Sequence, residues 1–512
     1  MPADAVQQIK KNAPFSASAS RAALQHDHGT LTPTHFCEPS ILRIIVQDYL
    51  DLVYPLLPLV HRRKFREQFD NDADAIDPDP CVFRLCLAVC AVTIASLPRK
   101  FDEYNKGRYA DIGAMVDRAC HLVLVSRISS ETLWQDRPAT STVIVSVLLA
   151  TASLYAGRVN QGWGYAIEAI HFFRTLGLYR REGYMHLPPL EHEFCKRAFW
   201  LLYIIQIHDR LSSVIPRTGL SFDPLRTDWQ FMFPQEMDDD DIGNPGASVI
   251  PHARGASGQL PVISGFVALI RVYLCIVDLL SYGLPGFYTP IYSMSLGSLR
   301  ASTQTDQPAG TATSDSTISL STLLRIIKKL QSTIEQLPDE LKISNLDSKL
   351  QASDVIPSAS PSASSCASSS RENQFNIMKA NIHITSLYIQ STILEACSNA
   401  FTHAQGNIAT SPSDAGSSPG YTPRTQVWVF RKSIAKELLE VLKFCSSRSL
   451  EANGQSVVVK IREIAATLLD SDDELESSSE QEEDSRQYVA QFANILADID
   501  HLGQFPPPMP AN

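Results

Sequence analysis

The sequence lacks the cysteine spacing that a zinc-binding turn requires. Its ten cysteines include no Cys-x2-Cys pair, which is the usual way for one tight turn to supply two tetrahedral zinc ligands. Cys86 and Cys90 stand four residues apart in an apolar run, so we expect them to be small hydrophobes on one buried helix face. The chain is therefore expected to hold no metal or other cofactor of its own.

Positive charge is also scarce. Lys and Arg number 44 against 55 for Asp and Glu, which gives a net charge of −11, and such a chain repels the phosphate backbone that nucleic-acid-binding proteins neutralise. The densest basic run, 62–64, is three residues long, and we expect it to be the solvated start of a helix rather than a DNA contact. No direct DNA binding is expected from this chain alone.

Long apolar runs and catalytic motifs are missing as well. No apolar run reaches the ~18 residues of a membrane-spanning helix without a charge or a proline, so no membrane association is expected. No Walker sequence, Gly-x-Gly-x-x-Gly or His-Glu-x-x-His occurs. One Gly-x-Ser-x-Gly lies at 416–420, inside a low-complexity linker, whereas a nucleophile elbow needs a strand before it. We predict that the chain is not an enzyme and has no catalytic residues.

Helical periodicity dominates the remaining sequence, and no strand pattern with turn residues between strands appears. The predicted fold is all-α, a multi-helix bundle with a disordered N-terminus and Ser/Pro-rich linkers. In order, we predict a disordered segment (1–39), a helical core (40–290), a linker (291–318), additional helices with disordered insertions near 353–372 and 407–423 (319–450), and an acidic C-terminal tail with short amphipathic helices (451–512).

Three segments allow local predictions. Residues 140–156 are rich in β-branched residues, but their length favours a fully buried helix over a strand. In the next helix, Trp163, Ile167, Ile170 and Phe173 are predicted to mark one face, and Gly177 is predicted to end it in the left-handed conformation. The acidic residues 238–241 are expected in a surface loop.

Three blocks of sequence carry a family resemblance. The first holds Tyr54-Pro55, Pro58 and His61; the second holds Trp163, Ala166, Ile167 and Leu176-Gly177-Leu178; the third holds Lys196-Arg197, Phe199-Trp200, Tyr203 and Pro216. In this order they resemble the regulatory "middle homology" domain of fungal zinc-cluster transcription factors.

The chain departs from the family pattern at three places. Gln206 stands where the family often has an acidic residue, and Val214-Ile215-Pro216 replaces its common Gly-Arg-Pro triplet. The six-cysteine zinc cluster that binds DNA in this family is absent. Zinc is expected only if such a cluster is encoded upstream of Met1.

The resemblance implies a nuclear regulator of transcription whose helical domain receives a signal from a small-molecule inducer or a partner protein. Homo- or heterodimers with related regulators are expected partners. The target genes suggested by the family are those of sugar and polysaccharide use or of a secondary-metabolite cluster. The alternative is a helical scaffold or inhibitor that does not bind DNA and pairs with a full-length relative.

Aromatic residues of the second and third blocks define a candidate effector pocket. Trp163, Phe172, Trp200, Tyr203 and His208 are expected to converge, because helical bundles place pockets between facing helices. The alternative interpretation is that these aromatic residues are ordinary core.

The C-terminal tail defines a candidate activation segment for a coactivator. An acidic run at 470–484 precedes Tyr488, Phe492, Ile495 and Leu496, and this acidic-plus-hydrophobic composition is typical of activation segments. A merely solvating linker is the alternative.

Overall fold

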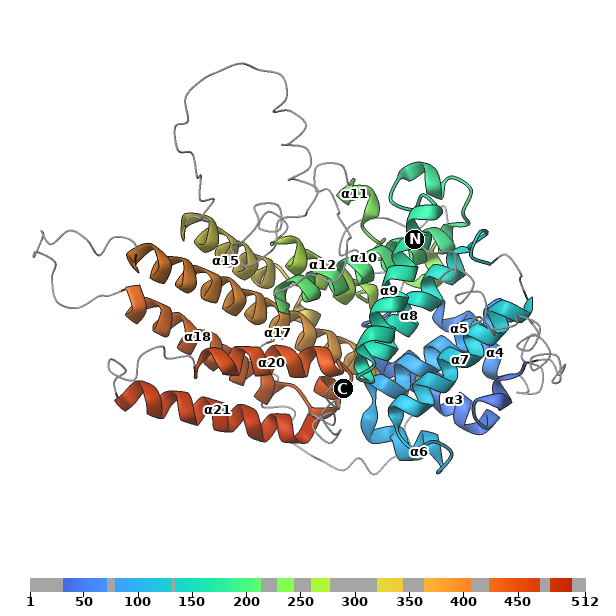
Figure 1. The fold of residues 1–512 in the computed structure, drawn as a ribbon, viewed down its shortest axis with the longest axis horizontal. Coiled ribbons are helices and arrows are strands. Elements are labelled where there is room, and N and C mark those ends of the chain that lie inside the picture. Colours follow the sequence, from blue (N-terminus) through green and yellow to red (C-terminus); the bar gives the residue numbers. More distant parts are fainter. Residues whose placement is uncertain are drawn as a thin grey trace, which may run out of the picture.

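The computed structural model describes residues 31–70, 79–130, 134–212, 228–243, 259–276, 320–343, 363–406, 423–469 and 479–499. Within these ranges every regular element is a helix (Figure 1), which confirms the all-α prediction. The segment 1–30, the linker 291–318, residues 353–362 of the first insertion and residues 407–422 of the second lie outside the described residues, as does Pro216. Residues 363–372, which we predicted to belong to a disordered insertion, form the start of α17 instead.

The N-terminal region runs from 33 to 212. Its elements are η1 (Pro33–His35), α3 (Pro39–Asp48), the π-helix η2 (Tyr49–Val53), α4 (Arg62–Asp70), α5 (Pro80–Ser96), η4 (Pro98–Lys100), α6 (Phe101–Asn105), α7 (Ile112–Ser130), α8 (Thr140–Tyr155), α9 (Val159–Thr175), η5 (Arg181–Tyr184) and α10 (Pro189–Ser212).

The C-terminal region follows. Its elements are α11 (Trp229–Met232), η6 (Asp239–Asp241), α12 (Ile263–Leu274), α15 (Leu320–Glu335), η7 (Asp339–Leu341), α17 (Ala363–Gly406), α18 (Pro423–Phe444), α19 (Ser447–Glu451), α20 (Gln455–Thr467) and α21 (Ser479–Ile499). The long helix α17 contacts α12, α15, α18, α19 and α20 and also reaches η2. It therefore joins the two regions, which lie side by side in Figure 1.

The antiparallel hairpin of α8 and α9 confirms two local predictions. The segment 140–155 is a helix, and all its residues from Thr142 to Ser153 are buried. Helix α9 ends at Thr175, and Gly177, two residues later, has a φ of +68°. Leu178 N donates to Phe173 O (3.1 Å) and Gly177 N donates to Arg174 O (2.9 Å), which is the hydrogen-bond pattern of a Schellman ending.

The predicted buried face of α9 is wrong at Ile167, which is 51% exposed. The buried residues include Gly162, Ala166 and Ala169 instead. A Cβ at Gly162 would lie 2.6 Å from Leu154 Cγ of α8. The small residues are buried because they let the two helices approach closely, and hydrophobicity alone does not indicate this.

Ordered structure begins before the predicted boundary at residue 40. Phe36 and Cys37 are buried in the core, and Tyr109 OH donates to Phe36 O (2.6 Å). The segment therefore packs on the body of the protein although its composition is that of a disordered chain. Cys86 and Cys90 are fully buried on α5, as predicted.

Candidate functional site

Residues 228–243, which we call the strap, cross the N-terminal region and are held by contacts of their acidic side chains with basic side chains of separate elements. The acidic side chains and their basic contacts are Asp228 with Arg181 (2.6 Å), Glu236 with Arg271 (2.6 Å), Asp238 with Arg62 (3.4 Å), Asp239 with Arg197 (2.9 Å) and Asp240 with His61 (3.4 Å). The basic residues come from η5, α12, α4, α10 and the turn before α4. The strap thus ties several parts of the chain together.

The centre of the strap corrects the prediction of a surface loop at 238–241. Asp239 is only 7% exposed, and its carboxylate accepts hydrogen bonds from Arg197 Nη1 (2.9 Å) and Tyr54 OH (2.7 Å). The same Arg197 nitrogen donates to Pro58 O (3.1 Å). A run of four aspartates suggests solvent exposure, but the buried Arg197 on α10 provides the countercharge that makes burial of one of them favourable.

Electrostatics keep both members of this buried pair ionised. Burial alone would raise the pKa of Asp239, but the charge of Arg197 and the hydrogen bonds from Tyr54 and Arg197 outweigh it and hold the pKa below its ordinary value. Burial would likewise lower the pKa of Arg197, and the Asp239 carboxylate more than compensates and raises it. The pair is a permanent charge contact at neutral pH.

Two of the three sequence blocks that carried the family resemblance meet at this pair. Tyr54 and Pro58 belong to the first block and Arg197 to the third. Their partner in the ion pair is Asp239, which was not among the candidate site residues predicted from the sequence. The signal that could have found it is an acidic cluster in a chain that carries an arginine, Arg197, directly before the apolar stretch 198–207.

Beside the ion pair, the strap covers an aromatic cluster. Trp200 is fully buried, and its Nε1 donates to Met232 O of the strap (2.8 Å). Its ring lies 5.4 Å from Tyr203, 5.5 Å from Trp229 and 5.4 Å from Phe233 between centroids. Two residues of the candidate effector pocket, Trp200 and Tyr203, are therefore in contact, under two aromatic residues of the strap.

The other pocket residues lie in different surroundings. Phe172 packs against Trp134, with ring centroids 5.8 Å apart. Trp163 is half-buried on α9. His208 faces Tyr273, whose hydroxyl lies 2.6 Å from His208 Nε2. Among the described ring contacts, the structure places these three residues apart from Trp200 and Tyr203.

His208 belongs to a buried polar junction between four helices. It comes from α10 and Tyr273 from α12, while Lys460 Nζ of α20 donates to Thr385 Oγ1 of α17 (2.7 Å). Burial lowers the pKa of Lys460 to about 7, since a low-dielectric interior disfavours the ammonium form. Burial, and then the charge of Lys460, lower the pKa of His208. Burial thus favours the neutral form of both bases over the charged form.

The candidate activation residues lie on α21, which packs against α18, α19 and α20. Phe492 is fully buried, and its ring stacks with that of Tyr488 at 6.4 Å. Ile495 and Leu496 are half-buried. The segment predicted as part of a tail is a docked helix.

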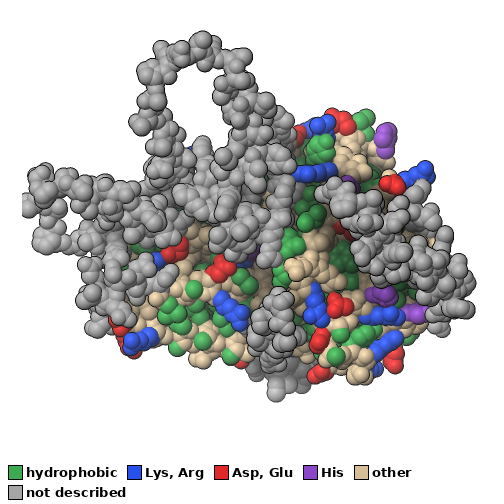
Figure 2. All heavy atoms as spheres, viewed as in Figure 1, with side chains coloured by type: hydrophobic (Ala, Val, Ile, Leu, Met, Phe, Trp, Pro, Cys, Tyr) green, Lys and Arg blue, Asp and Glu red, His purple; other side chains and the backbone are tan. Residues whose placement is uncertain are grey.

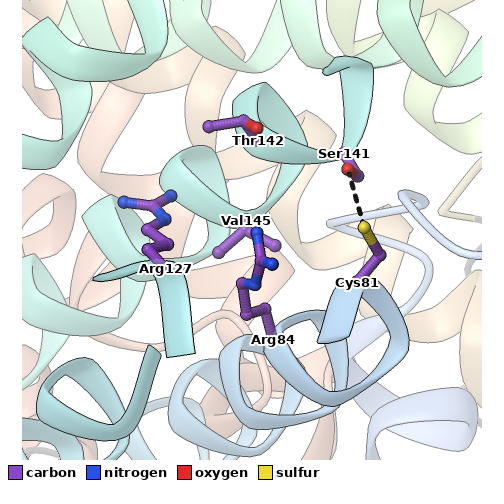
Figure 3. Close-up of a pocket in the computed structure, with 6 residues that line it drawn as sticks. All are labelled: Cys81, Arg84, Arg127, Ser141, Thr142 and Val145. Carbon is purple, nitrogen blue, oxygen red and sulfur yellow. Dashed lines mark hydrogen bonds between the residues drawn. The ribbon is translucent and has the colours of Figure 1, made fainter. Parts of the chain in front are cut away.

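A shallow cleft of about 180 Å³, including space open to solvent, lies between α5, α7 and α8. Figure 3 shows Arg84 and Arg127 at this cleft, with Cys81 close to Ser141. Arg84 Nε donates to Ser126 Oγ (3.2 Å), and Arg127 Nη1 donates to Glu168 (2.9 Å). Because their guanidinium groups are engaged in contacts between helices, we interpret both arginines as structural.

Two further features concern only the described residues. No three His, Cys, Asp or Glu side chains among them gather as metal ligands. No single helix in those ranges is long and apolar enough to cross a bilayer, although α5 and the helical segment after it, bent by 103°, pass that length and composition test together.

Comparison with known proteins agrees with the sequence blocks. The family model of the fungal specific transcription factor domain matches residues 46–351, which is more than half of the chain. No match was found among curated proteins. The matched range contains the strap, Arg197, the aromatic cluster and every basic residue paired with the strap above. The chain is a member of the family of fungal regulators that carry the fungal specific transcription factor domain.

Proposed function

We propose that the chain is a nuclear regulator of transcription that receives a signal through the strap and the aromatic cluster beneath it. The observation that carries this proposal is the family match across 46–351, a range in which all the contacts of the strap described above fall. The signal would be a small-molecule inducer or a partner protein, sensed where Trp200 and Tyr203 meet Trp229 and Phe233.

We further propose that these 512 residues do not themselves contact DNA. The net charge of −11 supports this, because DNA affinity depends on neutralising phosphates. On the face shown in Figure 2, the described Lys and Arg side chains lie among Asp and Glu side chains rather than in one basic field. Genes of sugar and polysaccharide use, or of a secondary-metabolite cluster, remain the proposed targets.

A reporter experiment tests the regulatory role. The whole chain is fused to an unrelated DNA-binding domain, and reporter expression is compared with that of the DNA-binding domain alone. We expect the fusion to change reporter expression relative to the DNA-binding domain alone. We expect a fusion that carries Trp229→Ala in the strap to give a different level of expression from the wild-type fusion. A silent fusion would contradict the proposal and favour the scaffold or inhibitor that pairs with a relative.

A mobility-shift assay tests the DNA proposal separately. We expect the purified chain to bind duplex DNA no better than a charge-matched control protein at moderate salt. Sequence-specific retardation would refute this part and leave the regulatory role standing.

A further inference from the structure

Helix α21 is the outermost element of the C-terminal region. It lies along the edge of that region beside α20 in Figure 1, and its main contacts are to α18, α19 and α20. It follows α20 in the sequence after residues 470–478. Its attachment is therefore local, in contrast to that of α17, which contacts both regions.

One face of α21 makes the attachment. Its buried residues are Ser485, Phe492 and Ile499, and Tyr488, Val489 and Leu496 are half-buried. These positions are spaced by three, four or seven residues and so form a single helical stripe. The opposite side, with Gln487 and Asn494, is exposed.

The docked stripe contains three of the four residues predicted to bind a coactivator. Tyr488, Phe492 and Leu496 cannot enter the apolar groove of a partner while they face α18 and α20, because an amphipathic helix has one apolar face to offer. Docking within the chain and binding to such a partner are mutually exclusive.

The attachment is also weaker than that of its neighbour. Helix α20 buries Val457, Val458, Ile461 and Ile464 almost completely, whereas on α21 only Phe492 and Ile499 are buried apolar residues. An ion pair between Lys432 of α18 and Asp484 holds the start of α21 at a partly exposed position. Elements with less buried apolar surface open at lower free energy than the core.

We propose that α21 is a releasable helix: docked on α18, α19 and α20 it hides its apolar face, and released it presents that face, beside the acidic run 470–484, to a partner protein with an apolar groove and basic rim. This inference rests on the proposed regulatory function. In this proposal, the docking of α21 on α18, α19 and α20 controls the activity of the activation segment.

The test compares two substitutions of equal charge on one helix. Ser485→Glu places a carboxylate on the docked stripe at a position that is 8% exposed, and the burial of a charge is costly. Gln487→Glu adds the same charge on the exposed side. Each is made in the whole chain and in the isolated segment 465–500, all fused to an unrelated DNA-binding domain.

We expect Ser485→Glu to raise reporter expression in the whole chain severalfold and Gln487→Glu to leave it unchanged. In the isolated segment the two variants should be equal, because no docking surface is present. Hydrogen exchange on the whole chain should be at least about tenfold faster in α21 for Ser485→Glu, which corresponds to a loss of about 1.4 kcal/mol in docking, with α20 unaffected.

Four outcomes would decide against the proposal. Unchanged exchange in Ser485→Glu would show that α21 is not releasable at this face. Faster exchange with unchanged reporter expression would show that docking does not control activity. A higher signal for Ser485→Glu than for Gln487→Glu in the isolated segment would show that the charge itself acts. Silence of the isolated segment with faster exchange in the whole chain would refute the activation role and the control built on it, but not the docking.

Discussion

The strap and α21 are both held on the body of the protein, by opposite means. The strap has polar anchors from several distant elements, including a fully buried arginine. Helix α21 has one apolar stripe and a partly exposed ion pair to elements close to it in sequence. The comparison teaches that a buried ion pair resists partial opening, because separating one partner leaves the other charge buried without compensation. An apolar stripe, by contrast, can detach as a unit.

Loss of the central anchor of the strap should have the largest effect. Arg197→Met leaves Asp239 buried without its countercharge, and we expect a loss of about 3–5 kcal/mol in the free energy of unfolding, measured by urea denaturation. The control is Arg181→Met, which removes an exposed partner of Asp228 and should cost at most about 1 kcal/mol. Equal effects of the two variants would show that the buried pair is not the anchor.

Disruption of the aromatic cluster under the strap should reduce the free energy of unfolding by a similar amount. Trp200→Ala removes a fully buried ring and its hydrogen bond to Met232 O, and we expect a loss of about 3–5 kcal/mol from the cavity. Trp163→Ala on the half-buried side of α9 is the matched control and should be milder. A Trp200→Ala protein that melts within a degree or two of the wild type would contradict the described burial of this ring.

The buried Lys460 sharpens the comparison with Arg197, because it is a second buried basic side chain but has no carboxylate hydrogen-bonded to it among the described contacts. Its pKa is about 7 in the folded protein against 10.5 ordinarily. Between these values the unfolded chain binds a proton that the folded chain has lost, so this residue makes stability rise with pH from 7 to 10.5. The slope is at most about 1.4 kcal/mol per pH unit.

Lys460→Met should abolish that rise and increase stability at pH 7 by roughly 2–4 kcal/mol. Denaturation at several pH values between 7 and 10.5 measures both effects. Lys436→Met, at an exposed position of α18, should change neither. A variant that retains the wild-type slope would show that another group titrates in this window.

The smallest effect on global stability is expected at α21. Phe492→Ala removes its only fully buried aromatic side chain, so the helix should detach and exchange its amides faster while the melting temperature of the body changes little. In the isolated segment 465–500, the same substitution should reduce reporter activation more than Glu483→Gln does. A strong fall in the melting temperature would mean that α21 is part of the cooperative core.

Much of the helical fold follows from local patterns, and the examples show why. The length of 140–156 and the glycine at 177 identify a buried helix and its end because both depend only on neighbours in the chain. The position of Ile167 does not follow, since the partner helix selects small residues for close contact. The burial of Asp239 could not be predicted for another reason: its partners Tyr54 and Arg197 are distant in sequence, and nothing in the sequence indicates that they meet at this aspartate. The same holds for α21, whose amphipathic pattern does not indicate whether its apolar face is already covered.

The graded exposure of the strap's ion pairs has a consequence for ionic strength. The pair of Asp228 and Arg181 is exposed, that of Asp238 and Arg62 is partly exposed, and that of Asp239 and Arg197 is buried. Dissolved salt screens exposed charges over a Debye length of about 8 Å at physiological concentration, and buried pairs much less. Rising salt should therefore weaken the exposed pair of Asp228 and Arg181 first and the buried pair of Asp239 and Arg197 last. The mobility of Trp229, which lies next to Asp228, should then increase with ionic strength before the helices of the protein separate.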